Sequence, residues 1–356
     1  MPGPPSAAGA RPWRRFLPPA LFVVLLLVLW LVRRPDDRVL STFRGNAQGS
    51  TWVVKLVTPA PLTADANVAA GRLIQAELDR VDASMSTWRP DSEIARFNAR
   101  QETTPFPISP PFVAVMGMAR AVSEASGGVF DVTVGPLVEA WGYGPDGVRS
   151  LPSEADLAAL KARVGYQRVT VEAGALRKER PDMHVDLSAI AQGYTVDLIV
   201  EALEAQGYTD LFVEVGGETR AAGRNEAGRI WQVGIEVPSD SEAGVSRVLA
   251  LNDTAIATSG DYRRYREQSG QRVSHTIDPR TGRPITHRLA SVTVVHARCA
   301  LADAWATALN VLGPEEGPAL ARRLGLAAFF LIRSPDGTWQ QVATDAFETV
   351  AGKALP

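Results

Sequence analysis

The sequence predicts an α+β fold of two lobes, in which helices pack on largely antiparallel sheets, preceded by one N-terminal transmembrane helix. Short β-rich runs and helical periodicity follow each other without the regular strand–helix alternation of a doubly wound sheet. One uncharged apolar run stands near the N-terminus. The chain of 356 residues has 46% hydrophobic and 21% charged residues, which is typical of a globular protein.

The apolar run covers residues 16–32 and has arginines on both sides. A stretch of about 17 to 25 apolar residues spans a bilayer as a helix, and an arginine-rich leading end favours the cytoplasm. The run lacks the small-residue pattern of a cleavage site. A buried core helix is the alternative. We therefore expect four segments: a cytoplasmic basic N-terminus (1–15), an uncleaved anchor in the inner membrane (16–32), a tether (33–42) and a folded domain on the periplasmic side (43–350).

Charge and cysteine content exclude several classes of protein. The 37 Lys and Arg against 39 Asp and Glu give a net charge of -2, without the basic excess that nucleic-acid binding requires. Cys299 is the single cysteine, so an intrachain disulfide or a multi-cysteine metal site cannot form. Nucleic acid is therefore not an expected partner.

Periodicity and end signals define the elements of the folded domain. Val68, Leu73, Ile74, Leu78 and Val81 have helical spacing behind Asp65. Further helices are predicted from Ser109 to Gly127, from Ser153 with a capping box to Asp156, and over 189–206, 299–312 and 315–324. Strands are predicted at 167–172, 183–187, 210–215, 230–237, 247–251, 291–295 and 327–332.

The predicted helix from Cys299 carries a candidate metal site. Asp303 and Thr307 are four residues apart, so their side chains project from the same side of the helix. A carboxylate and a hydroxyl are hard oxygen ligands suited to Mg²⁺, which keeps other positions for water and phosphate. Taken alone, the pair also fits a solvated acid and a threonine bonded to its own helix.

His275 is the candidate proton acceptor. It stands at a strand end, before the turn sequence from Asp278 to Gly282. A histidine with an ordinary pKa near about 6.5 can accept a proton from an attacking hydroxyl. In isolation the position also fits a structural or exposed histidine.

Three further segments suggest ligand contacts. Asp186 and Ser188 precede a helix whose first turn offers free N–H groups to an anion, although an ordinary cap is the alternative. Trp88, in a predicted loop, could stack on a flat ligand, although burial as a core aromatic fits it better when it is taken alone. Glycines at 215–218 and 257–262 follow strands, where backbone can approach a ligand.

The sequence WGYGPDG at 141–147 contains a dinucleotide-binding pattern, G-x-G-x-x-G. We reject that interpretation because Pro145-Asp146-Gly147 predicts a turn, whereas the mechanism needs a helix there and a strand before it.

The order of these segments resembles the ApbE family of FAD:protein FMN transferases over about residues 45–313. The matching segments are GSTW, MSTWRPDSEIARFN, GGVFDVTVGPLVEAWGYG, VDLSAIAQGYTVD, VEVGGE, ATSGDYRRY, HTIDPRTGRP and ALADAWATAL. The resemblance implies an exported, Mg²⁺-dependent enzyme that takes FAD, attaches FMN through a phosphoester bond to a threonine or serine of an acceptor flavoprotein, and releases AMP. The acceptor would be an Rnf- or Nqr-type or other FMN-binding domain.

The resemblance also implies roles for individual residues. The metal ligands would be Asp303, Thr307 and the backbone carbonyl of Ala189, and His275 would be the base. The flavin nucleotide would be held by Gln48, Trp88, Val129, Phe130, Asp131, Asp186, Gln192 and Ile277.

The chain departs from the commonest family pattern at three positions. Gln48 replaces a usual methionine, Gln192 a frequent lysine and Glu214 a usual asparagine. Two alternative functions use the same residues: an FAD pyrophosphatase, in which water replaces the acceptor hydroxyl, and a membrane-tethered flavin-binding protein without catalysis.

Overall fold

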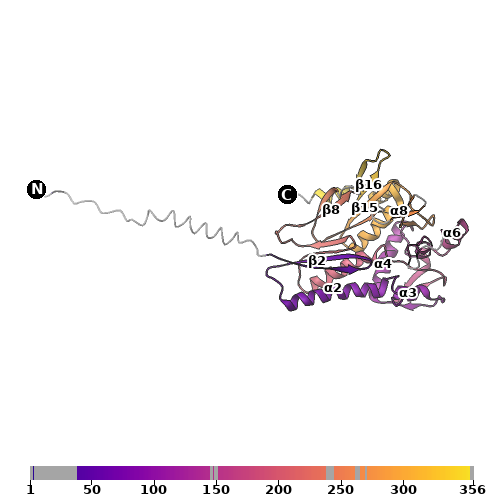
Figure 1. Ribbon diagram of the computed structural model, residues 1–356, viewed down its shortest axis with the longest axis horizontal. Coiled ribbons are helices and arrows are strands. Elements are labelled where there is room, and N and C mark those ends of the chain that lie inside the picture. Colours follow the sequence, from indigo (N-terminus) through magenta and orange to yellow (C-terminus); the bar gives the residue numbers. More distant parts are fainter. Residues whose placement is uncertain are drawn as a thin grey trace.

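The protein was examined as a computed structural model, which describes residues 38–144, 151–237, 244–260, 265–268 and 271–352 together with Gly3 and Gly147 (Figure 1). The predicted anchor at 16–32 lies outside these residues. Within the described part of the chain, no helix combines the length and apolar character needed to cross a bilayer.

The fold is built around one eight-stranded sheet in which every neighbouring pair is antiparallel. This confirms the predicted antiparallel character. In spatial order the strands are β1 (Val39–Ala47), β2 (Ser50–Thr58), β6 (Asp210–Val215), β7 (Glu218–Ala222), β10 (Thr254–Gly260), β15 (Leu289–His296), β16 (Ala327–Arg333) and β17 (Trp339–Ala343).

Smaller antiparallel sheets surround the main one. They are β3 (Phe106–Pro107) with β5 (Ala175–Lys178) and β4 (Val169–Glu172), β8 (Trp231–Val237) with β9 (Gly244–Leu251), β11 (Tyr265–Gln268) with β12 (Gln271–Ser274), and β13 (Ile277–Asp278) with β14 (Arg283–Pro284). The β13–β14 hairpin is the turn that the sequence predicted after His275.

The helices begin and end close to their sequence signals. Ser153 and Asp156 form the predicted capping box, and Ser109 precedes a helix with proline in its first turn. The helices are α2 (Ala64–Met85), α3 (Glu93–Ala99), α4 (Pro110–Ala125), α5 (Gly135–Ala140), α6 (Glu154–Lys161), the 3₁₀ turn η2 (Tyr166–Arg168), α7 (Ala191–Ala205), α8 (Cys299–Leu324) and α9 (Asp345–Gly352). The two helices predicted at 299–312 and 315–324 are confirmed: they share the label α8 and are separated by non-helical backbone at Gly313, with φ of 80° and ψ of -169°.

Other elements cover both faces of the main sheet. Helices α2 and α7 pack on β2 and β6, and α8 packs on β10, β15 and β16 on the same face (Figure 1). The other face is covered by the β8–β9 hairpin and α9. Side chains therefore alternate between two cores along a strand, as they do in β16, where Phe330 and Phe329 belong to different clusters.

Three expectations need correction. Strand β1 begins at Val39, inside the segment predicted as tether. Val68 is 50% exposed and does not belong to the core face of α2. Residues 183–187 are not a strand, although Met183, Val185 and Leu187 are buried in alternation. Alternating burial here reflects an extended chain without a strand ladder: Asp186 N donates to Val132 O at 2.7 Å, and a side chain holds Val185.

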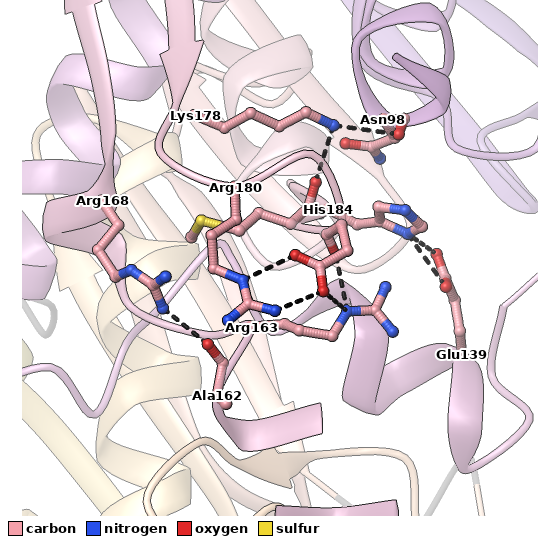
Figure 2. A network of polar contacts seen from close by, with 10 residues as sticks. Asn98, Glu139, Ala162, Arg163, Arg168, Lys178, Arg180 and His184 are labelled. Carbon is pink, nitrogen blue, oxygen red and sulfur yellow. Dashed lines mark hydrogen bonds and ion pairs between the residues drawn. The ribbon is translucent and has the colours of Figure 1, made fainter. Parts of the chain in front are cut away.

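That side chain is Asn98, whose amide bonds both main-chain groups of Val185 at 2.8 Å. Lys178 fixes the same region: its Nζ donates to the carbonyl oxygens of Phe97, Asn98 and Met183 at 3.2–3.3 Å (Figure 2). These contacts hold the chain that leads to Asp186.

Ion pairs hold the surface side of the same segment (Figure 2). Asp182 contacts Arg180 at 2.7 Å and Arg163 at 3.7 Å. His184 Nδ1 lies 2.9 Å from a carboxylate oxygen of Glu139 on α5. The segment is therefore tied to α5 as well as to α3.

Lys178 is 1% exposed, and burial, with help from Arg100, lowers its pKa from 10.5 to about 8. At pH values between these two pKa values, Lys178 is protonated in the unfolded chain and deprotonated in the folded chain. The contribution of Lys178 to the free energy of unfolding therefore rises with pH over this range. We expect Lys178→Met to remove this rise, which urea unfolding of both proteins across that pH range would measure. Identical pH slopes would contradict the assignment.

Candidate functional site

A cavity of about 580 Å³ opens at the end of the main sheet where the β6–β7 hairpin turns. Its walls come from α7, α8, the loop before α5, strands β8 and β10, and the chain after β12. Ten of the predicted site residues line it: Val129, Phe130, Asp131, Asp186, Ala189, Gln192, His275, Ile277, Asp303 and Thr307. Residues that are far apart in the sequence therefore meet in one place.

Asp303 and Thr307 lie one turn apart on α8, and both line the cavity. Asp303 is 8% exposed, which excludes a solvated acid at this position. Its Oδ2 accepts the main-chain N–H of Gly193 at 3.2 Å. Burial raises the pKa of the Asp303 carboxyl to about 7, and the Gly193 N–H opposes that effect. The carboxylate is thus poorly neutralised by the protein itself.

The start of α7 supplies the neighbouring wall. Asp186 Oδ1 accepts the N–H of Ser188 at 2.8 Å in a local turn before α7; the N-cap of α7 is Ile190, so the interpretation of Asp186 or Ser188 as an ordinary cap is wrong. Ala189 and Gln192 follow on the cavity side. Gly216, with φ of 70°, leaves room for Gln192, because a Cβ there would lie 2.6 Å from the Gln192 amide nitrogen.

His275 enters from the chain after β12, as predicted for a strand end. Its ring meets the ring of Tyr143 edge-on, with centroids 6.3 Å apart. The following hairpin is rigid: Gly282 N donates to Asp278 O at 2.8 Å, and Arg280 Nε bonds the Asp278 carboxylate at 3.0 Å. The imidazole is therefore presented by fixed backbone.

The Asp131 carboxylate accepts hydrogen bonds from its own loop and from the start of η2. Oδ1 accepts from the main chain of Thr133 at 2.8 Å and from its hydroxyl at 2.6 Å, and Oδ2 accepts the N–H of Tyr166 at 2.9 Å. Burial raises the pKa of Asp131, and the bonds from Thr133 oppose the rise. The carboxylate shapes the stretch that carries Val129 and Phe130.

Two predicted residues are not among those that line the cavity. Gln48 sits in the β1–β2 turn with φ of 54°; its Nε2 donates to Thr195 Oγ1 at 2.7 Å, and its carbonyl accepts from Gln192 Nε2 at 3.4 Å. It touches the site through Gln192. Trp88 is 66% exposed, so its interpretation as a core aromatic is wrong.

The cavity has a strongly acidic lining. Six carboxylates contribute to it, and the described lining residues include no lysine or arginine. The acids are Asp131, Asp186, Glu214, Glu218, Glu236 and Asp303. Several of these acids have partners of their own, Glu214 among them, which accepts the main-chain N–H of Gly217 at 2.9 Å.

The donor set fits a hard divalent cation. Among the described residues, no three His, Cys, Asp or Glu side chains gather in a way that could hold a metal. One buried carboxylate, the Thr307 hydroxyl and a carbonyl leave several coordination positions for water and substrate oxygens, which Mg²⁺ prefers. The poorly neutralised charge of Asp303 supports the same conclusion.

The sequence reasoning missed part of the site. Phe212 and residues 233–236 of β8 line the cavity, although nothing in their strand pattern marks them. Gly193 could have been found, because an isolated glycine inside a helix often marks a close packing contact. The rejected pattern at 141–147 follows helix α5, so no strand precedes it; Pro145 and Asp146 lie outside the described residues.

Comparisons with known proteins agree with this geometry. A family model described as the ApbE family matches residues 48–330. The FAD:protein FMN transferase of Vibrio cholerae serotype O1 is 38% identical over 333 residues, covering 92% of this chain and 97% of that protein.

Two solved structures have the same fold. The flavin transferase ApbE from Vibrio cholerae superposes with a TM-score of 0.81 at 37% identity, covering 88% of this chain and 99% of that one. The apo form of the Pseudomonas stutzeri flavinyl transferase ApbE also gives 0.81 at 37% identity, covering 89% and 98%.

Replacing Asp131 tests whether its buried bonds hold the cavity loop. We expect Asp131→Asn to lower the free energy of unfolding by about 1–3 kcal/mol, because one buried donor loses its acceptor. Asp336 makes the same pair of bonds to Thr338 on the surface. Asp336→Asn should change stability by less than about 0.5 kcal/mol. Equal effects of the two changes in denaturant unfolding would refute this role.

Proposed function

The chain belongs to the ApbE family, and we propose that it is a Mg²⁺-dependent FAD:protein FMN transferase. It would attach FMN through a phosphoester bond to a threonine or serine of an acceptor protein and release AMP. The observation that carries the proposal is the convergence of Asp303, Thr307 and His275 on one cavity with an acidic lining.

The buried carboxylate of Asp303, one helical turn from Thr307 at the cavity wall, supports the dependence on a divalent cation. The FAD diphosphate is an anion, and a cation held by these oxygens would attract it to the cavity. Asp303, Thr307 and the Ala189 carbonyl would hold the cation. When bound, Mg²⁺ neutralises charge on the phosphates and stabilises their displacement.

The protein residues would perform the remaining steps. The acceptor hydroxyl oxygen attacks the phosphorus of the FMN half, the bond from that phosphorus to the bridging oxygen breaks, and AMP leaves with the bridging oxygen. His275 takes the hydroxyl proton as the new phosphoester forms. The hairpin after His275 restricts its position, which favours reaction through orientation.

The first turn of α7 would hold the substrate without a positive side chain. Gln192 can donate its amide to a phosphate or flavin oxygen, and the carbonyl of Gln48 restricts where that amide lies. Val129 and Phe130 add apolar surface to the same cavity. The neutral amide at 192 adds no positive charge to that contact.

We also propose, from the sequence of residues 16–32, that a single N-terminal helix anchors the protein in the inner membrane with the cavity on the periplasmic side. The acceptor would then be a protein exposed on that side, such as an Rnf- or Nqr-type FMN-binding domain.

The proposal is tested by incubating the protein with FAD, Mg²⁺ and a threonine-containing acceptor domain, and weighing that domain by mass spectrometry. A mass increase of one FMN is expected, and EDTA should prevent it. Release of free FMN and AMP without a labelled acceptor would favour FAD hydrolysis instead, and FAD binding without AMP release would favour a non-catalytic protein.

Variants in the candidate metal site should change this reaction. Asp303→Ala should abolish transfer, and Thr307→Val should slow it, because each removes an oxygen ligand. Thr349→Val makes the same change at a helical threonine that does not line the cavity and bonds the main chain of its own helix, and is the matched control. Full activity of Asp303→Ala would contradict the assignment of Asp303 as a metal ligand.

Replacing the candidate base should slow the chemical step alone. We expect His275→Gln to reduce the rate of transfer by about 10²- to 10⁴-fold, the usual contribution of a general base. His184→Gln is the control, because His184 pairs with Glu139 away from the cavity. Rates would be followed by AMP release at saturating FAD; an unchanged rate for His275→Gln would rule out the role.

A further inference from the structure

Asp197 is a completely buried carboxylate that the proposed chemistry does not use. It lies on α7, outside the cavity lining, and is 0% exposed. Its Oδ1 accepts from Arg220 Nη1 at 3.0 Å and from the main-chain N–H of Cys299 at 3.0 Å. Its Oδ2 accepts from the main-chain N–H of Ala300 at 3.1 Å and from Arg298 Nε at 3.3 Å.

These bonds cap α8 from another helix. Cys299 and Ala300 are the first two residues of α8, and Arg298 before them gives no side-chain cap. Free N–H groups of a first turn need an acceptor, and a carboxylate there is also favoured by the helix dipole. Asp197 therefore fixes the start of α8 against α7.

The capping is reciprocal. Gly193 lies in the first turn of α7, and its N–H is bonded by Asp303 from α8. No side-chain cap comes from Ile190. Each helix thus places a carboxylate on the first turn of the other, with Asp197 four residues after Gly193 and Asp303 four residues after Cys299.

Close packing prevents the helices from sliding. A Cβ atom at Gly193 would lie 2.5 Å from the carbonyl oxygen of Cys299 and 2.9 Å from the nitrogen of Ala300. These are backbone atoms and cannot move aside without moving α8. The position of Asp303 therefore depends on the contact between the first turns of the two helices.

We propose that Asp197 is a positioning residue of the candidate metal site, acting through the first turn of α8 to set Asp303 and Thr307. The inference rests on the proposed function, because it assumes that these two residues bind the cation. Partners that orient metal ligands typically change metal affinity by about 10- to 100-fold when removed.

The test is direct binding of Mn²⁺ to the full-length protein. The concentration of unbound Mn²⁺ is measured from its electron paramagnetic resonance signal. Mn²⁺ is used because it takes the same hard oxygen ligands as Mg²⁺. We expect Asp197→Asn to weaken Mn²⁺ binding by about 10-fold or more. Arg220→Met is the matched control: it removes one of the two ion pairs of Asp197 but leaves the Arg298 contact and both main-chain bonds, so it should lower the melting temperature and leave Mn²⁺ affinity within about twofold.

The possible outcomes distinguish failure of the proposed metal site from failure of the proposed role of Asp197. If the wild type binds no Mn²⁺, or if its affinity for Mn²⁺ equals that of Asp303→Ala, the metal site and the inference are both overturned. If Asp303→Ala loses Mn²⁺ while folded Asp197→Asn keeps wild-type affinity, only the inference is overturned. If Asp197→Asn does not fold, Asp197→Glu decides: it keeps the charge but moves the acceptor of the Cys299 and Ala300 N–H groups, so weakened Mn²⁺ binding is expected, and unchanged affinity overturns the inference.

Discussion

At Gly193, α7 approaches α8 so closely that only a hydrogen atom fits between the α-carbon and the backbone of Cys299. This contact places the first turns of both helices beside the end of the main sheet, where the cavity opens. Asp303 is 8% exposed, and its carboxylate accepts the N–H of Gly193 across the same contact. The helix crossing therefore fixes the candidate ligands of α8 against the first turn of α7.

Under the proposed function, this arrangement suits a substrate that carries its charge as phosphate. If Asp303 and Thr307 hold a divalent cation, that cation would attract a diphosphate and stabilise its displacement. A hydrophobic sheet core on one side and the rigid hairpin after His275 on the other keep these groups in place. Binding and activation of the diphosphate would then depend on the same cation.

Much of this could be predicted from the sequence because the signals are local. The Asp303–Thr307 spacing on a helix, the turn after His275 and the caps at Ser109 and Ser153 depend on neighbours along the chain. The convergence of the candidate ligands also followed from the family resemblance. What could not be predicted depends on contacts between distant segments: the bond from Asn98 that replaces a strand partner, the wall formed by β8 and the role of Asp197.

The most direct test of this account is the affinity of the protein for FAD, measured by calorimetry with Mg²⁺ and again with EDTA. The account predicts that affinity falls by at least about 10-fold without the metal, and that Asp303→Ala binds FAD equally weakly in both conditions. Equally tight binding of FAD by the wild type in EDTA would contradict it, because the site would then bind the diphosphate without a cation.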